Sequence, residues 1–232
     1  MTCCLFSWTA RRGFSQATVD VISPDTFGQN FSPALPFGRF CWNVFALSVA
    51  SILPFLLVYI FTTPGFATML AQNSTALGRF IRQVMTNGLP VVFLVNYLGF
   101  VFAFVTLKHA RRLQIGYIFL DVVLRSVTFV GAHIVVYVLS ADLFASFGGS
   151  RATALSVVGP TLRWSFMFTN VSGVYLYALA PGAFVAVLAV LSQPGRMTAD
   201  LAQSNVSRTA LLCSLIPIPV VTVLSIVLTL AA

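Results

Sequence analysis

The residues most able to do chemistry in this sequence lie in one apolar stretch near its middle. Asp121 and Arg125 are four residues apart, and His133 follows about two helical turns later. On a helix, residues four apart lie about 40° from each other on one face, so Asp121 and Arg125 can form an ion pair. Ionisable groups are costly inside a membrane and are candidates for function wherever they occur there.

This pair is compatible with two roles. In one, Asp121 titrates on a proton or ion path and Arg125 holds its charge. In the other, the neutralised pair locks its helix against a neighbour, with Asn96, Tyr97 or a partner subunit satisfying the remaining polar atoms. We expect the structural role, because no second acid occurs in the apolar stretches of the chain to receive a proton.

Other chemistries lack the residues they need. His109 and His133 would stand about 30 Å apart along the bundle, too far to ligate one haem iron. The four cysteines have no metal-ligand spacing, and there is no Gly-rich phosphate loop and no Ser/His/Asp set. We therefore expect no catalytic residue, no metal and no cofactor. The one class of ligand that we expect is phospholipid.

The composition defines the elements that must position these side chains. Hydrophobic residues make up 58% of the 232 residues, charged residues 8%, and the mean hydropathy is +0.94. A soluble domain has about 25% charged residues, so this chain cannot cover a surface in water. A soluble enzyme is excluded, and an all-α integral membrane protein is predicted, since no stretch alternates as β-barrel strands do.

Five stretches are long enough, at about 20 apolar residues each, to span the bilayer as helices. They are residues 40–61, interrupted by Pro54; 87–107; 113–139, which contains Asp121, Arg125 and His133; 171–191, with Pro181; and 210–230.

The orientation follows from the basic residues, which are retained on the side of insertion. One side holds Arg11, Arg12, Arg39, Lys108, Arg111, Arg112, Arg196 and Arg208, and the other holds Arg79, Arg82, Arg151 and Arg163. Eight against four predicts an N-terminus on the inner side. The cluster of Lys108, Arg111 and Arg112 is also a candidate contact for lipid headgroups.

Two connections are too apolar to be plain solvated loops. Between the first two spans, apolar residues recur at helical spacing from Phe66 to Val84, which predicts a short helix lying in the interface. Residues 151–168, broken by Gly159-Pro160, predict either a second interfacial segment or an early start to a long, tilted fourth span.

The N-terminus resembles a mitochondrial presequence. Residues 1–19 contain Arg11, Arg12, several Ser and Thr, and no acid. Arg12-Gly13-Phe14-Ser15 is similar to a presequence cleavage signal, which implies cleavage after Phe14. We therefore divide the chain into a presequence (1–14), a polar segment (15–39) and one multi-span domain (40–232).

Other compartments leave different signatures. A bacterial twin-arginine signal needs an apolar run directly after Arg11-Arg12, and the sequence there is polar. Glycosylation acceptors such as Asn73 and Asn170 would suit the secretory pathway. Palmitoylation of Cys3-Cys4 would suit an uncleaved cytosolic N-terminus, and a bacterial protein without any signal is the plain alternative.

Small residues mark one helix contact. Ala178, Gly182 and Ala186 recur every four residues in the fourth span, a spacing that lets helix backbones approach closely. The shorter pair of Gly99 and Ala103 occurs in the second span. We predict a contact along the 178–186 stripe, either within the chain or to a partner.

Together these features predict a non-catalytic accessory subunit of an oxidative phosphorylation complex, the respiratory chain or ATP synthase, in the mitochondrial inner membrane with its N-terminus in the matrix. Its partners would be other membrane subunits and the lipid bilayer, and not nucleic acid, because the basic residues flank spans. The alternative is a small transporter or channel for protons, ions or a solute, built around Asp121 and Arg125.

Overall fold

The computed structural model describes residues 27–109, 114–139 and 151–192, and every regular element in these ranges is a helix. Four of the helical stretches are long and apolar enough to cross a membrane. This confirms an all-α membrane protein. The predicted fifth span (210–230), the cleavage site after Phe14 and the interior of the 140–150 connection lie outside the described residues.

The spanning helices occur where the apolar stretches predict them. The first is α2 (Phe37–Thr62), the second α5 (Leu89–His109) and the third α6 (Gln114–Leu139). The fourth consists of α9 (Val171–Tyr177) and α10 (Ala180–Ser192). The chain folds this way because about 20 consecutive apolar residues can satisfy their backbone in lipid only as a helix.

Prolines disturb these helices less than the sequence analysis expected. Pro54 lies inside an unbroken α2, and Pro160 lies inside an unbroken helix α8 (Arg151–Ser165), so the predicted interruptions at both points are wrong. A proline removes one helical hydrogen bond but does not force the chain to turn. Before Pro181 the helix does break, at Ala178–Leu179, where the Leu179 N–H bonds Leu176 O in a tighter turn.

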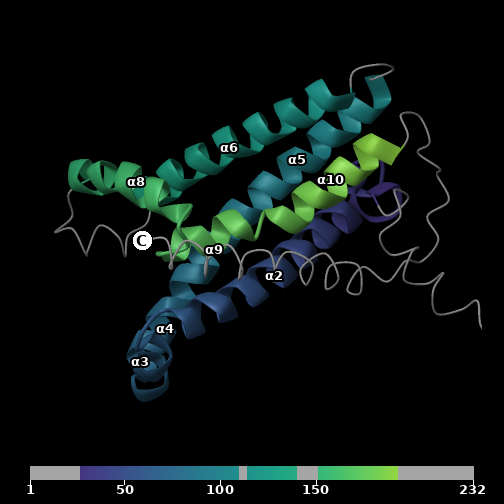
Figure 1. Ribbon diagram of the computed structural model, residues 1–232. Coiled ribbons are helices and arrows are strands. Elements are labelled where there is room, and N and C mark those ends of the chain that lie inside the picture. The colour runs from purple at the N-terminus through teal and green to yellow at the C-terminus, as the bar shows by residue number, and fades with distance from the viewer. Residues whose placement is uncertain (1–26, 110–113, 140–150, 193–232) are drawn as a thin grey trace, which may run out of the picture.

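The connection between the first two spans is helical, as its apolar spacing predicts. It consists of α3 (Phe66–Gln72), α4 (Ser74–Gln83) and the π-helical η2 (Val84–Gly88), which leads into α5. Asn73 begins α4 by accepting a hydrogen bond from the N–H of Ala76 at 3.0 Å. Both short helices lie at the end of the bundle where α2 finishes (Figure 1).

The structure also distinguishes the two alternatives for residues 151–168. Helix α8 ends at Ser165, and Phe168 adopts a left-handed φ of 56°, which turns the chain before α9 begins. Asn170 fixes this turn, because its side chain accepts from the N–H of Gly173 and donates to the carbonyl of Thr161. Helix α8 is therefore a separate element and not an extension of the fourth span.

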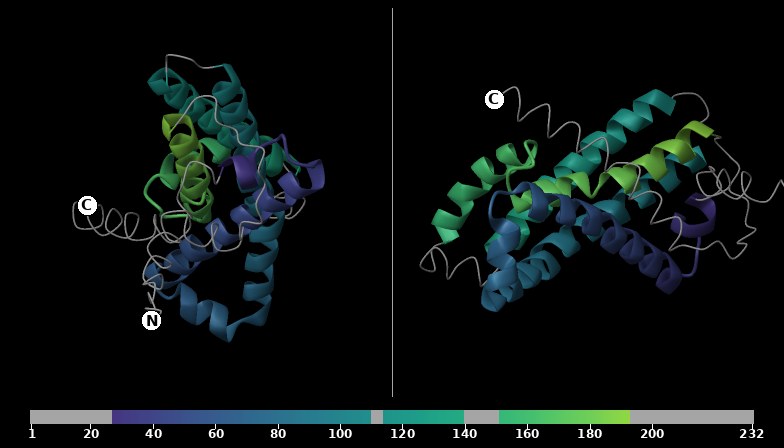
Figure 2. Two further views of the ribbon diagram at one scale, coloured as in Figure 1. Left: turned by 90° about the vertical axis from the view of Figure 1, so that its right-hand side faces the viewer. Right: turned by 60° about the horizontal axis from the view of Figure 1, so that its bottom comes forward.

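Helix α5 occupies the centre of the bundle. It packs against α2, α6 and α10; α6 and α10 run alongside it, whereas α2 crosses it at an angle (Figures 1 and 2). A short π-helix before α2, η1 (Phe27–Phe31), closes one end of this packing: the Phe31 ring stacks on Phe100 of α5 with centroids 4.8 Å apart. Part of the N-terminal segment 15–39 thus contributes buried apolar side chains to the core.

Candidate functional site

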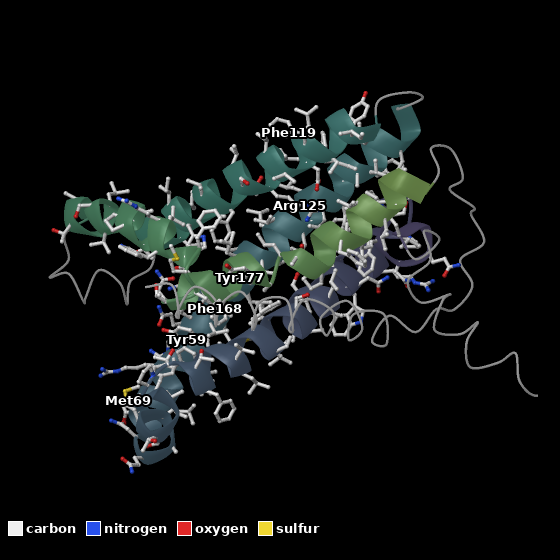
Figure 3. The ribbon with its side chains drawn as sticks, in the orientation of Figure 1. Tyr59, Met69, Phe119, Arg125, Phe168 and Tyr177 are labelled. Carbon is white, nitrogen blue, oxygen red and sulfur yellow. The ribbon has the colours of Figure 1, made fainter. Side chains whose placement is uncertain are left out.

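Asp121 and Arg125 form an ion pair on α6, as their spacing predicts. The Arg125 Nε donates to Asp121 Oδ2 at 2.7 Å. The Arg125 side chain is 6% exposed and that of Asp121 9%, so both charges lie inside the protein and not toward lipid. Figure 3 shows Arg125 directed from α6 toward the other helices, whereas Phe119 points away from the bundle. Two charges buried together in this way are stable only if they remain paired.

The guanidinium of Arg125 extends beyond Asp121 to helix α5. Its Nη1 lies 3.5 Å from Oδ1 of Asn96, and its Cζ lies 5.7 Å from the centre of the Phe100 ring. Gly99 provides the space, because a Cβ there would overlap the guanidinium. A ring face and an amide oxygen are both attractive surroundings for a buried cation. Tyr97 packs its ring against Phe40 instead.

Asn96 continues the polar contacts to helix α2. Its Nδ2 donates to Ser48 Oγ at 3.2 Å, and that hydroxyl donates to the carbonyl of Val44 at 2.8 Å. Asn96 and Ser48 are both fully buried. We call Asp121, Arg125, Asn96 and Ser48 the central polar chain: it connects α6, α5 and α2 through side chains alone.

The small-residue stripe of the fourth span packs inside the protein. Ala178, Gly182 and Ala186 are buried, and a Cβ on Gly182 would overlap Oδ1 of Asn96. Helix α10 therefore comes within van der Waals contact of the central polar chain without adding a polar group. The sequence left open whether this stripe contacts another helix of the chain or a partner. The structure shows an internal contact, with α5.

A small cavity of about 10 Å³ adjoins Asp121. Thr106, Tyr117 and Ala186 are among the side chains that line it. Neither Asp121 Oδ1 nor Thr106 Oγ1 has a hydrogen-bond partner in the described part of the chain, and Arg125 Nη2 has none either. A cavity of this size holds about one water molecule. The wall of this cavity is apolar, so the buried oxygens of Asp121 and Thr106 do not open into it, and the cavity is too small for a solute.

His133 lies apart from the central polar chain. It is buried two turns farther along α6, where its Nδ1 is 3.1 Å from the carbonyl oxygen of Phe129. Its ring lies 4.2 Å from that of Phe129 and 6.1 Å from that of Tyr175, between centroids. The structure thus surrounds His133 with aromatic rings and does not bring it to Asp121 and Arg125. Within the described ranges, no three His, Cys, Asp or Glu residues cluster as metal ligands.

The basic cluster after the second span is only partly placed. Lys108 belongs to the last turn of α5, whereas Arg111 and Arg112 lie in the 110–113 gap between the described ranges. Their contact with lipid headgroups stays a prediction.

Three polar or small residues of the site were not assigned to it from the sequence. Ser48 is one of several serines in an apolar span, and Thr106 likewise has no distinguishing neighbour. Gly99 was noted only for packing, although its role is to admit the Arg125 guanidinium. Ser48, Thr106 and Gly99 are identified only by the packing of helices that are distant in the sequence.

Comparison with known proteins adds no family to this picture. No protein-family model matches the chain, and neither the curated proteins nor the solved structures yield a match.

Proposed function

We propose that this protein is a non-catalytic, membrane-embedded accessory subunit of an oxidative phosphorylation complex in the mitochondrial inner membrane, either in the respiratory chain or in ATP synthase. The observation that carries the proposal is the central polar chain. Its one acid and one base neutralise each other, and its amide and hydroxyl connect three helices. Such an arrangement suits a fixed scaffold, because moving α6 away from α5 would expose the buried charges of Asp121 and Arg125.

The surroundings of the pair support a fixed scaffold over a conduction path. The cavity beside Asp121 has room for about one water. A relay would require further titratable groups, and Asp121 is the only acid in the described ranges. His133, the nearest candidate along α6, faces aromatic rings and not the pair.

The outer faces of the bundle suit a subunit that packs against other membrane proteins or lipid. Only about a third of α2 and of α6 is buried within the chain, against half or more for the second and fourth spans. The outward side of α6 is mostly apolar, with Ser126 as an exposed polar residue; its exposed apolar residues include Ile115, Phe119, Val123, Val127, Val130 and Ile134. Helix α6 thus has one polar side turned inward and one apolar side free for neighbours.

The mitochondrial location rests on sequence. Arg11, Arg12 and the Arg12-Gly13-Phe14-Ser15 signal support import, and the excess of basic residues on one side supports an N-terminus in the matrix.

One observation favours the alternative of a small transporter or channel. Asp121 Oδ1 and Thr106 Oγ1 are buried without partners beside the same cavity. This alternative requires a proton or small cation to reach the two buried oxygens, and it makes Asp121 and Thr106 its binding groups.

Gentle solubilisation of mitochondria containing the C-terminally tagged full chain, followed by native electrophoresis and mass spectrometry of the tagged band, tests the proposal. Comigration with a respiratory complex or with ATP synthase is expected. A tagged band at monomer size in mitochondria, or a chain that does not enter mitochondria, would overturn it. Transport by that monomer in liposomes would establish the alternative.

A further inference from the structure

The end of the bundle formed by α3, α4 and α8 carries exposed arginines beside exposed apolar side chains. Arg79 and Arg82 are exposed on α4, and Arg163 is exposed in the last turn of α8. Both helices lie at the end where α2 finishes and α9 begins (Figures 1 and 3). The connections 62–88 and 140–170 lie on one side of the membrane, because the chain crosses the membrane twice between them, in α5 and α6.

Helix α4 continues through η2 into α5 as one helix, Ser74–Leu107, so α4 forms the outer end of the second span. Phe80 and Val84 pack into the protein core, while the next residues around the helix, Leu77, Ile81 and Met85, are apolar and exposed. Arg82 and Arg79 lie beyond these apolar residues, on the next part of the helix circumference. At the end of a span, arginine side chains extend to the headgroups while neighbouring apolar side chains contact the acyl chains.

Helix α8 repeats the pattern at the same end. Arg163 is followed by Trp164, Phe166 and Met167, all exposed. Tryptophan prefers the headgroup level of a bilayer, where its ring is half in hydrocarbon and its N–H can reach water. Two separate elements thus combine exposed arginine with exposed apolar or aromatic side chains.

The charge at this end has little compensation. The two connections contain four arginines and one acid, Asp142. In the described ranges the single ion pair is that of Asp121 with Arg125, inside the bundle, so none of Arg79, Arg82 and Arg163 is paired there. An anionic group would complement them.

We propose that this arginine face, Arg79, Arg82 and Arg163 with the apolar residues beside them, binds the headgroups of anionic phospholipids in the leaflet opposite the Lys108–Arg112 cluster. The arginines contact lipid phosphates, while Leu77, Ile81, Met85 and Trp164 contact the upper acyl chains. Binding of these headgroups enriches anionic lipid around the protein on the side of the membrane where the protein has fewer basic residues. It does not depend on which complex, if any, the protein joins.

Fluorescence quenching of Trp164 by brominated lipid tests the proposal. The full chain with Trp8→Phe and Trp42→Phe retains one tryptophan, which lies next to Arg163. It is reconstituted into phosphatidylcholine bilayers containing an equal minor fraction of either brominated phosphatidylglycerol or brominated phosphatidylcholine. We expect the anionic lipid to quench Trp164 more strongly than the neutral lipid. Each arginine that contacts a headgroup should raise the affinity for the anionic lipid, relative to the neutral one, about fivefold.

Arginine variants in the same background give the control. Replacing Arg79, Arg82 and Arg163 by Gln should make the two brominated lipids quench equally, and replacing them by Lys should preserve the preference. The matched set Arg39→Gln, Arg111→Gln and Arg112→Gln, on the other predicted side, should leave it intact. Equal quenching before any arginine is changed, or a preference that survives the Gln variant, would overturn the proposal. If the two lipids quench equally before any substitution, the arginine face would instead bind an acidic protein partner.

Discussion

Gly182 of α10 lies directly against the side-chain amide of Asn96 on α5: a Cβ at position 182 would come closer than 3.0 Å to Asn96 Oδ1. The amide cannot simply turn aside, because it also contacts Ser48 on α2 and Arg125 on α6. One missing methyl group therefore lets four helices meet at a single side chain.

The substitution Gly182→Ala should destabilise the protein. The added methyl displaces Asn96 from its partners, an overpacking effect of about 1–3 kcal/mol. Gly131→Ala is the matched control, because a Cβ at that α6 position meets nothing within 4 Å and both changes gain helix propensity alike. Thermal unfolding in detergent measures the difference. Equal midpoints for the two variants would contradict the packing described for α10.

The substitution Asp121→Asn should be more damaging than removal of the whole pair. It leaves Arg125 buried without its counter-charge, which costs about 3–5 kcal/mol, whereas Asp121→Leu with Arg125→Met replaces both charges by apolar groups and should recover most of this loss. Unfolding midpoints and the amount of native complex measure both effects. Normal assembly of Asp121→Asn together with lost transport would refute the structural role.

The substitution Thr106→Val should be neutral or stabilising. The Thr106 hydroxyl is buried without a partner in the described structure, and valine has nearly the same shape without the polar atom. Removing such a group gains up to about 1 kcal/mol. Ser48→Ala serves as the contrast, since Ser48 has hydrogen bonds to lose and should cost about 1 kcal/mol. A clear loss of stability or of transport in Thr106→Val would show that this hydroxyl has a ligand.

Asn73 should carry no glycan in the native protein. The acceptor Asn73-Ser74-Thr75 is exposed between α3 and α4, so no described part of the protein covers it. An unmodified Asn73 would therefore indicate that the protein does not pass through the secretory pathway. We expect no change of electrophoretic mobility after treatment with an N-glycanase.

The control for this prediction is the same chain carrying a secretory signal, which should be glycosylated unless Asn73 is changed to Gln. A glycan on the native chain would contradict the mitochondrial location.

Much of this architecture follows from local sequence. The spans are apolar runs, and the Asp121–Arg125 pair follows from its four-residue spacing on one helix. The partners of the pair do not follow in this way. The sequence offers Asn96 as one of several candidates. The contacts of Ser48, Gly99 and Gly182 depend on how four helices pack, which a pattern within one helix does not determine.

Prolines show a similar limit. The sequence suggests a break at Pro54 and at Pro160, but both helices are unbroken, and the break in the described helices occurs before Pro181, where none was predicted. The turn that separates α8 from α9 occurs instead at Phe168, whose left-handed backbone is unusual for a bulky residue and has no sequence signal.

The contact between Asn96 and Arg125 also bears on how the chain enters the membrane. Helix α6 is the least apolar of the four spanning helices, and it carries both charges of the pair. Helix α5 precedes it and presents the amide of Asn96, the Phe100 ring and the space at Gly99. In N- to C-terminal order, the receiving surface is therefore in place before the charged helix arrives. Damage to Asn96 or Gly99 should then appear first as failed insertion of α6, before any defect in the finished protein.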